Sequence, residues 1–571
     1  MNRRFVFCLM TSIIFVFTFL SAQQGEIANL IASQRTDGSQ IVDIFYDLIG
    51  DEEAYTITVE VSFDGGMDFL TVNAILGASA AGEAIIPGID KWIGWSIGED
   101  FPDQFNETTR IKITAVYDET IDYNRQLTIL YTNDEHGWLV REGNTGGVSE
   151  LMGQWRQVEG YTEDGPFLIL SGGDNWTGPA ISTWFKGEST VEAMNAMQYD
   201  VSTIGNHEFD FGQDILQTRI EEAYFPYLSA NMVREDNGEQ HELALPYTIK
   251  VVNGIHVGII GLTFLGADDI NFPESVENID FIDYAGVLNE VVPQVRAEGA
   301  ELLVVTSHMC DGGVQSIMPL LNELGVTFIG GGHCHWTISE IVDGVGHIEA
   351  GSNFSSYGKV IIGYNILEDV VTNLEVSTHL NEGLYTDQAV ADVVAYWQAQ
   401  LQNDLSEVIG FVENEVGDSS DPMFNLITDS WLEAYPADIS FTNRGGIRQP
   451  MPPGDITIET WVGILPFENF LYEIELTGQQ LMDSVGPYVV GGMTTIPTYQ
   501  LADGTPIDPN ATYSVLLTDY IYQTEGNFSV MDPTPYETSI HWRTPCINWI
   551  SSKNTSIDDP LDNYLDYTPR Q

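Results

Sequence analysis

The pattern of hydrophobic and polar positions changes twice along the chain. Between residues 25 and 122, apolar and polar residues alternate in short segments such as Tyr55–Phe63 and Arg110–Tyr117, and Gly65-Gly66 follows the first of these. Alternation with a period of two predicts half-buried strands joined by tight turns. We therefore expect an all-β sandwich of immunoglobulin or fibronectin size, serving as a spacer or an adhesive module.

From Gln126 to about residue 375, continuous apolar runs are interleaved with helical stretches. Short apolar runs bounded by turn signals are typical of buried strands, and strands that alternate with helices predict α/β layers. The strands are expected at Leu127–Tyr131, Phe167–Ser171, Val201–Ile204, His256–Leu262, Glu301–Thr306 and Val326–Ile329.

One amphipathic helix is predicted over residues 387–405, where apolar residues recur at helical spacing. We interpret it as a connector between domains, because a last α+β block, residues 406–571, follows it. The apolar positions of the helix are Ala389, Val390, Val393, Val394, Trp397 and Leu401.

Composition limits the classes of partner. The 571 residues carry a net charge of −64, with 20 Lys and Arg against 84 Asp and Glu, and 43% of them are hydrophobic. So much apolar material excludes a disordered chain, and so much negative charge repels nucleic acid polymers and anionic membrane surfaces. An anionic substrate must therefore be attracted locally, for example by bound cations.

The first residues predict an export signal. Met1–Arg4 is basic, Phe5–Leu20 is apolar, and Ser21-Ala22 offers small residues for cleavage, so we expect residues 1–22 to be removed. A membrane anchor is the alternative, but the apolar run is short for a span and no later transmembrane segment replaces it. The mature protein is expected in the periplasm, on the cell surface or in the exterior.

Three cysteines remain after the signal: Cys310, Cys334 and Cys546. Because the number is odd, no disulfide framework is implied. We expect all three to be buried packing residues.

Polar clusters follow five of the predicted strands and contain five of the ten histidines. Strand alternation would place Asp134 and His136 on one side, and the same spacing relates His333 to His335. Oxygen and imidazole donors gathered at strand ends predict a metal centre, in which Asp174 could bridge two ions. The remaining cluster residues are Asn206, His207 and His308, and Asp210 is close enough in sequence to hold the ring of His207.

In this order the clusters closely resemble those of the calcineurin-like metallophosphoesterases, specifically the exported 5′-nucleotidase branch, from Gln126 to about residue 375. The resemblance implies two sheets flanked by helices and two divalent metal ions, Zn, Mn or similar, which lower the pKa of a bridging water. His207 would stabilise the charge on the transferring group and Asp210 would orient it. One ion would be bound by Asp134, His136, Asp174 and His335, and the other by Asp174, Asn206, His308 and His333.

The last block resembles the substrate-binding domain of the same branch, in stretches such as Phe441–Arg448 and Leu465–Asn469. The resemblance implies that Arg448 contacts the substrate anion, that Phe467 stacks on a base and that Asn443 donates a hydrogen bond nearby. The alternative is that Arg448 pairs with a carboxylate and that Phe467 belongs to the core.

This block also departs from the family pattern. Where the family has an aromatic residue followed by Gly-Gly-Asp-Gly, this chain reads Asp519–Phe528. Asn527 replaces the aspartate expected to hold the base or ribose, and the second stacking ring is either Tyr520 or Tyr522.

We therefore expect an exported phosphohydrolase that cleaves nucleoside 5′-monophosphates into nucleoside and phosphate, by in-line attack of a hydroxide that bridges the two metals. Alternatives within the enzyme class are a 2′,3′-cyclic nucleotide phosphodiesterase and a nucleotide-sugar hydrolase. An alternative of another class is a surface adhesion protein with vestigial catalysis. The complete ligand set favours an enzyme, while any surface ligand of the β-sandwich is left open.

Overall fold

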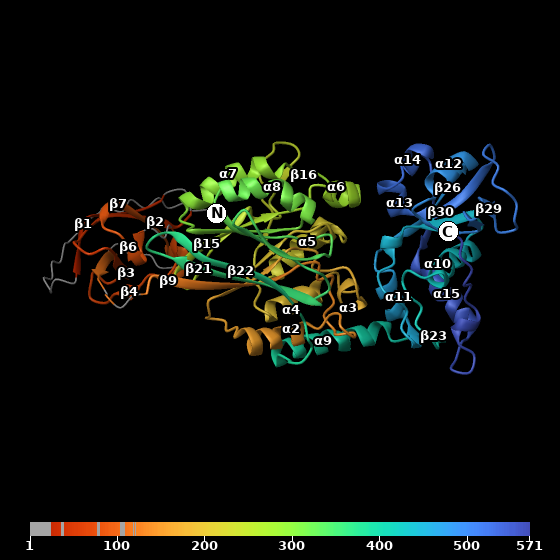
Figure 1. The fold of residues 1–571 in the computed structure, drawn as a ribbon, viewed down its shortest axis with the longest axis horizontal. Coiled ribbons are helices and arrows are strands. Elements are labelled where there is room, and N and C mark those ends of the chain that lie inside the picture. The colour runs from red at the N-terminus through yellow and green to blue at the C-terminus, as the bar shows by residue number, and fades with distance from the viewer. Residues whose placement is uncertain (1–23, 36–38, 77–79, 103–108, 118, 120–121) are drawn as a thin grey trace, which may run out of the picture.

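The computed structural model describes residues 24–35, 39–76, 80–102, 109–117, 119 and 122–571. The predicted export signal, residues 1–22, lies outside this range. Three domains follow one another along the long axis (Figure 1): an all-β domain at one end, an α/β domain in the middle and an α+β domain at the other end.

The all-β domain consists of two antiparallel sheets that share strand β1. Gln24 and Gly25 of β1 pair with β8, whereas Glu26–Gln34 pair with β2. Every second side chain of β3 enters a core that also contains residues of β2 and β7, such as Trp95. The strands are β1 (Gln24–Gln34), β2 (Ile41–Ile49), β3 (Tyr55–Ser62), β4 (Leu70–Thr71), β5 (Ile75–Leu76), β6 (Gly82–Ile85), β7 (Gly88–Ser96) and β8 (Arg110–Val116).

The α/β domain contains two six-stranded sheets, ordered β12-β11-β10-β9-β21-β22 and β14-β15-β17-β18-β20-β19. Strands β9 to β12 are parallel in the first sheet, and β15, β17, β18 and β20 are parallel in the second. The first sheet contains β9 (Asn124–Thr132), β10 (Phe167–Ser171), β11 (Val201–Thr203), β12 (Tyr227–Leu228), β21 (Ser356–Asn365) and β22 (Val370–Leu380).

The second sheet confirms the remaining strand predictions. Three of its four parallel strands are buried along their whole length, as expected where both faces of a sheet are covered. They are β14 (Tyr247–Val252), β15 (Ile255–Leu262), β17 (Leu302–Ser307), β18 (Val326–Gly330), β19 (Thr337–Val342) and β20 (Val345–Ala350), and a separate small pair is formed by β13 (Met232–Arg234) and β16 (Ile279–Phe281).

Helices cover the outer faces of both sheets, which gives four layers (Figure 1). Between the sheets lies an apolar core that includes Leu170, Val257 and Val304. Helices α7 (Tyr284–Ala297) and α8 (Asp311–Glu323) pack on the second sheet; on the side of the first sheet lie α2 (Val148–Gln154), α3 (Ala180–Thr183), α4 (Glu188–Ala196), α5 (Gln213–Glu222) and α9 (Gln388–Leu405).

Helix α9 is the predicted connector and leads to the last domain (Figure 1). It begins after Asp387, whose side chain accepts a hydrogen bond from the backbone N–H of Val390. Val390, Val394 and Trp397 are buried as predicted, whereas Ala389 is exposed.

The α+β domain is built on a five-stranded sheet, ordered β27-β24-β30-β26-β31. Helix α12 begins at Gly478, where Thr477 and Gln480 form a capping box. The strands are β23 (Val408–Val412), β24 (Ile439–Thr442), β25 (Gly454–Thr457), β26 (Phe470–Thr477), β27 (Val489–Gly491), β28 (Met493–Thr494), β29 (Gln500–Leu501), β30 (Thr512–Thr518) and β31 (Tyr536–His541). The helices are α10 (Asp421–Ala434), α11 (Ile458–Ile464), α12 (Gly478–Ser484), α13 (Asp519–Thr524), α14 (Phe528–Met531) and α15 (Arg543–Lys553).

The prediction that all three cysteines are packing residues is wrong for two of them. Cys310 and Cys334 form a disulfide, which ties the loop after β17 to the loop after β18. The odd count concealed this pair because Cys546 is a free, buried thiol in the last domain, as expected.

Among the described helices, none is both long enough and apolar enough to cross a membrane.

Candidate metal centre and its neighbours

The predicted metal ligands all follow the carboxyl ends of parallel strands. Strands β9, β10 and β11 of one sheet and β17 and β18 of the other end beside one another, at the edge where the two sheets meet. The loops that leave these ends carry Asp134 and His136, Asp174, Asn206, His308, and His333 and His335.

Strand alternation is not the reason why Asp134 and His136 lie close together. Strand β9 ends at Thr132, and both residues have left-handed backbone conformations, with φ of 52° and 45°. The same conformation occurs at Asp174, His333 and His335. Left-handed backbone at non-glycine residues is uncommon and concentrates at functional sites, where the surrounding structure holds it in place.

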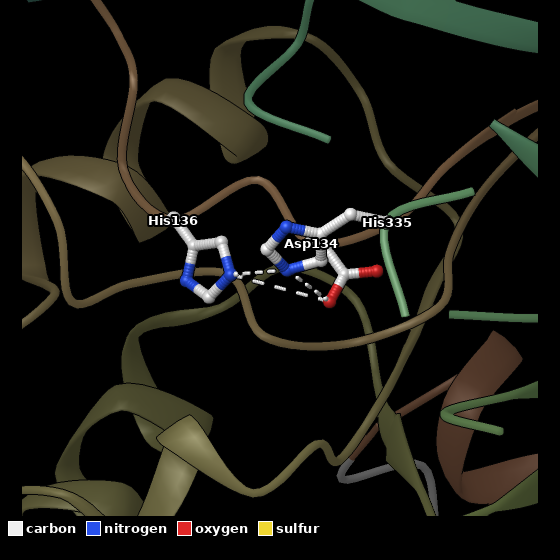
Figure 2. A group of neighbouring side chains, drawn as sticks. All are labelled: Asp134, His136 and His335. Carbon is white, nitrogen blue, oxygen red and sulfur yellow. Dashed lines mark hydrogen bonds and ion pairs between the residues drawn. The ribbon is translucent and has the colours of Figure 1, made fainter. Parts of the chain in front are cut away.

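One group of donors consists of Asp134, His136 and His335 (Figure 2). The Nε2 atoms of the two histidines are 3.1 Å apart, and Nε2 of His335 lies 3.3 Å from Oδ1 of Asp134. Two atoms bound to one ion at about 2.1 Å lie about 3.0–3.4 Å apart, so this spacing fits a shared divalent cation.

A second group of donors lies beside the first. Nε2 of His308 is 3.0 Å from Oδ2 of Asp174 and 3.2 Å from Oδ1 of Asn206. Nδ1 of His333 approaches the same amide oxygen at 2.9 Å. Asp174 also groups with His136, so its carboxylate lies between the two sets of donors. Nitrogen and oxygen donors in this proportion suit Zn, Mn or similar ions.

Burial and charge set the protonation of these histidines. Burial holds the pKa of His136 well below its usual value and lowers that of His333 to about 4, so both rings are neutral and can bind a metal. Burial would also lower the pKa of His308, but the adjacent Asp174 outweighs it and raises that pKa to about 10. A cation that binds His308 must therefore displace a proton.

His207 and Asp210 lie together as predicted. Nδ1 of His207 is 2.7 Å from Oδ2 of Asp210, and its backbone N–H donates to Asp174 at 2.8 Å. Burial tends to lower the pKa of His207, but Asp210 and Asp174 offset this and raise it above its usual value. The ring of His207 is therefore held at the edge of the metal centre, and the two carboxylates favour its protonated, positively charged form.

Two residues of the last domain reach this centre. The guanidinium of Arg448 lies 3.4 Å from Nε2 of His136, and the ring of Phe467 stacks on that of His207 with centroids 5.9 Å apart. Arg448 has no carboxylate partner among the ion pairs of the described residues. The alternative interpretation of Arg448, as half of a salt bridge, is therefore not supported.

The other predicted substrate contacts differ in position. Tyr520 extends toward the α/β domain, where its hydroxyl donates to the carbonyl of Ile270, whereas Tyr522 is buried in the core of its own domain. Asn443 donates to Glu525, and Asn527 is exposed before helix α14. Tyr520 is thus the ring that lies at the interface, and Tyr522 is not available for stacking.

Glu208 was not predicted to contribute to the site, although it belongs to the same loop as His207. It is buried and accepts hydrogen bonds from the backbone N–H groups of Gly205, Asp174 and Asn175, at 2.6, 2.9 and 2.8 Å. One carboxylate thus fixes two of the metal-binding loops against each other. In the sequence, only its position directly after His207 indicated that Glu208 could contribute to the site.

A cavity of about 200 Å³ lies between the two domains. It is lined on one side by Trp138, Gly178 and Asn353 together with the metal-binding side chains, and on the other by residues around Arg448. This volume is below the roughly 300–1,000 Å³ of sites for drug-sized ligands.

The comparisons relate this architecture, two stacked sheets with histidine and carboxylate donors at their strand ends followed by an α+β domain, to 5′-nucleotidases. Residues 399–488 match the family described as the 5′-nucleotidase C-terminal domain. The chain is 21% identical to a 5′-nucleotidase precursor from Thermus thermophilus, whose crystal structure matches with a TM-score of 0.66 over 78% of this chain and 99% of that one.

Curated relatives agree with this class. Endonuclease YhcR of Bacillus subtilis is 28% identical over 460 residues, which cover 70% of this chain and 37% of that protein, so the chain spans little more than a third of its length. A 5′-nucleotidase of Vibrio parahaemolyticus is 26% identical over 427 residues, covering 63% of this chain and 74% of that protein. The resemblance expected from the motifs is confirmed, and these relatives are hydrolases.

Metal binding should release about one proton from His308 at neutral pH, because its pKa of about 10 keeps the ring protonated until a cation displaces the proton. The affinity should accordingly rise as the pH rises toward that value. Calorimetric titration with Zn²⁺ in buffers of different ionisation enthalpy counts the protons. A wild-type protein that releases no more protons than His308→Asn would contradict the expectation.

The Glu208→Gln variant should bind metal about 10–100-fold more weakly. Its amide offers one acceptor oxygen and turns an NH₂ group toward backbone donors, so at least one buried N–H group loses its partner. Chelator competition measures the affinity, and Glu221→Gln, an exposed substitution on α5, is the matched control. Unchanged affinity in Glu208→Gln would show that this carboxylate does not hold the loops.

Proposed function

We propose that this chain is an exported phosphohydrolase that converts nucleoside 5′-monophosphates to nucleoside and phosphate at two divalent cations. The proposal rests chiefly on the convergence of two donor groups on Asp174. When bound there, the pair of ions would activate a water and neutralise phosphoryl oxygens during in-line displacement. The relatives named 5′-nucleotidase support the same reaction class.

Residues of this chain would position the phosphoryl group beside the ions. Arg448 presents a fork of N–H donors to the anion, and no carboxylate among the described ion pairs competes for it. His207, held by Asp210, would donate a hydrogen bond from Nε2 to an oxygen that gains negative charge during phosphoryl transfer. These groups attract an anion locally, in a protein whose net charge of −64 repels it at long range.

The nucleoside would lie between Phe467 and Tyr520. Phe467 already presents a ring to the centre, where it stacks on His207, and Tyr520 lies at the domain interface. Base–aromatic stacking contributes about 1–3 kcal/mol per base. Asn443 would have to exchange its bond to Glu525 for one to the base.

We propose that nucleotide binding requires the last domain to move. The cavity of about 200 Å³ is small for a nucleotide, and Arg448 touches His136 directly. Residues 406–407, between α9 and β23, are where such a hinge would lie. Closure would then bring Arg448 and Phe467 onto the bound substrate.

Cleavage of 2′,3′-cyclic nucleotides or nucleotide sugars is the second candidate. It is supported by the exposed Asn527, at the position where the family resemblance implies an aspartate that selects the nucleoside. The relative named an endonuclease also points to diester chemistry.

The predicted signal, residues 1–22, supports export, and the β-sandwich would serve as a spacer or adhesive module.

Turnover of a nucleoside 5′-monophosphate with added Mn²⁺ or Zn²⁺ should fall to the background rate in Asp174→Ala, because both ions lose a shared ligand. Asp214→Ala, an exposed substitution at the start of α5, should keep the wild-type rate. Phosphate release measures both. Equal rates in Asp174→Ala and the control would remove the proposed reaction.

The Arg448→Gln variant should lose about 10–150-fold in kcat/KM, since a hydrogen bond to a charged group contributes about 1.5–3 kcal/mol. The matched control is Arg444→Gln, because Arg444 is exposed and its guanidinium lies over Phe424 at 4.7 Å, away from the centre. Steady-state kinetics with a nucleotide, a 2′,3′-cyclic nucleotide, a nucleotide sugar and a simple sugar phosphate provide the comparison.

The same panel tests the nucleoside contacts. If the sugar phosphate is cleaved as efficiently as the nucleotide, the roles of Phe467 and Tyr520 are wrong, while the metal centre is unaffected. If Arg444→Gln and Arg448→Gln lose activity equally, Arg448 has no specific role toward the anion.

A further inference from the structure

A second cluster of potential metal ligands lies on the outer side of the second sheet. Asp311 is the first residue of α8, and Gln315 follows one turn later on the same face. Glu340 on β19 and His347 on β20 are direct partners across the antiparallel pair, so their side chains share one face of the hairpin. The carboxylates of Asp311 and Glu340 and the ring of His347 group within 4.8 Å of one another.

His347 is the residue that sets this cluster apart from an ordinary acidic surface. Its side chain is 0% exposed, and neither ring nitrogen has a hydrogen-bond partner among the described residues. Nδ1 faces the two carboxylates, 3.6 Å from Oε1 of Glu340 and 3.8 Å from Oδ1 of Asp311. Buried imidazole nitrogens are normally satisfied, so this geometry calls for a further group.

The amide of Gln315 occupies the space between the two carboxylates. Its Nε2 donates to Oδ1 of Asp311 at 3.0 Å and to Oε1 of Glu340 at 2.7 Å. Rotation of the amide by half a turn would present its oxygen in place of the NH₂ group, since the two are almost equal in size. The cluster can therefore offer a fourth donor to a cation without moving the backbone.

We propose that Asp311, Glu340 and His347 bind a divalent cation of the zinc class, with Gln315 or a water as the fourth ligand. Two carboxylate oxygens and an imidazole nitrogen suit Zn²⁺, Mn²⁺ or Co²⁺, whereas Ca²⁺ prefers oxygen ligands alone. Asp311 and Glu340 are partly exposed, so an ion has access from solvent and the carboxylates can close on it.

The position of this site gives the ion a structural role. Asp311 directly follows Cys310, whose disulfide partner Cys334 stands between His333 and His335. The other ring nitrogen of His347 lies against Gly331, in the loop that carries the same two histidines. An ion at His347 would therefore hold the loops after β17 and β18 in position. It would share no ligand with the centre at Asp174, and this proposal does not depend on the proposed function.

The test counts bound ions in the full chain after removal of metals by a chelator and dialysis against buffered Zn²⁺. We expect Asp311→Asn/Glu340→Gln to bind one equivalent fewer than wild type, as measured by elemental analysis. The matched control Glu323→Gln/Asp343→Asn removes two exposed carboxylates from the same helix and from the turn of the same hairpin, and should bind as many ions as wild type.

Two outcomes would overturn the proposal. Either the Asp311/Glu340 variant retains every equivalent of wild type, or it and the control lose ions to the same extent, which would mean diffuse binding to an acidic surface. An Asp174→Ala chain separates the two sites: it should lose ions of the proposed catalytic centre while keeping the one at His347. Replacement of the bound Zn²⁺ by Co²⁺ adds a spectroscopic readout. In His347→Gln, the absorption of the Co²⁺ ion at this site should change, while that of the other bound Co²⁺ ions should not.

Discussion

The carboxyl ends of five parallel strands, three in one sheet and two in the other, meet where the sheets face each other. The loops that leave these ends bring two aspartates, an asparagine and several histidines together, with neighbouring donor atoms 2.9–3.3 Å apart. Without a bound cation, the protonated ring of His308 and the guanidinium of Arg448, which lies beside His136, offset the repulsion among these lone pairs. Divalent cations would resolve this conflict, and the buried Glu208 and left-handed backbone keep the donors in place meanwhile.

The acidic surface and the domain interface follow from the same constraint. A net charge of −64 gives an anionic substrate no general attraction, so the positive groups must be concentrated at the cavity. The last domain contributes Arg448 to that cavity and stacks Phe467 on the neighbouring His207, and the long helix α9 joins it to the α/β domain. Under the proposed function, chemistry and substrate selection would be divided between the two domains on either side of this cavity.

The spacing of apolar residues predicted the strands and the connecting helix, because in these elements the apolar positions are the ones that become buried. Runs such as Leu302–Ser307 are buried on both faces, and Val394 and Trp397 mark the inner face of α9. It could not predict why Asp134 and His136 converge, since this depends on left-handed backbone after the strand has ended. Counting cysteines likewise missed the bond between Cys310 and Cys334, which only the proximity of two loops creates.

Residue identity alone was also insufficient in the last domain and in the outer cluster. Tyr520 and Tyr522 are equivalent in sequence terms, and burial alone assigns the second to the core. Glu340 and His347 become neighbours through hairpin register, and Asp311 joins them only because α8 packs against that sheet. Long-range packing therefore decides which polar side chains share a site, even where every element is predictable.

Anomalous diffraction at the zinc absorption edge, from crystals of the protein grown with Zn²⁺, tests the central claim most directly. At this centre we predict two peaks about 3.5–4 Å apart, one on each side of the Asp174 carboxylate. One peak would be bonded to His136 and His335, and the other to His308 and His333. A map without a peak within bonding distance of Asp174 would contradict the account.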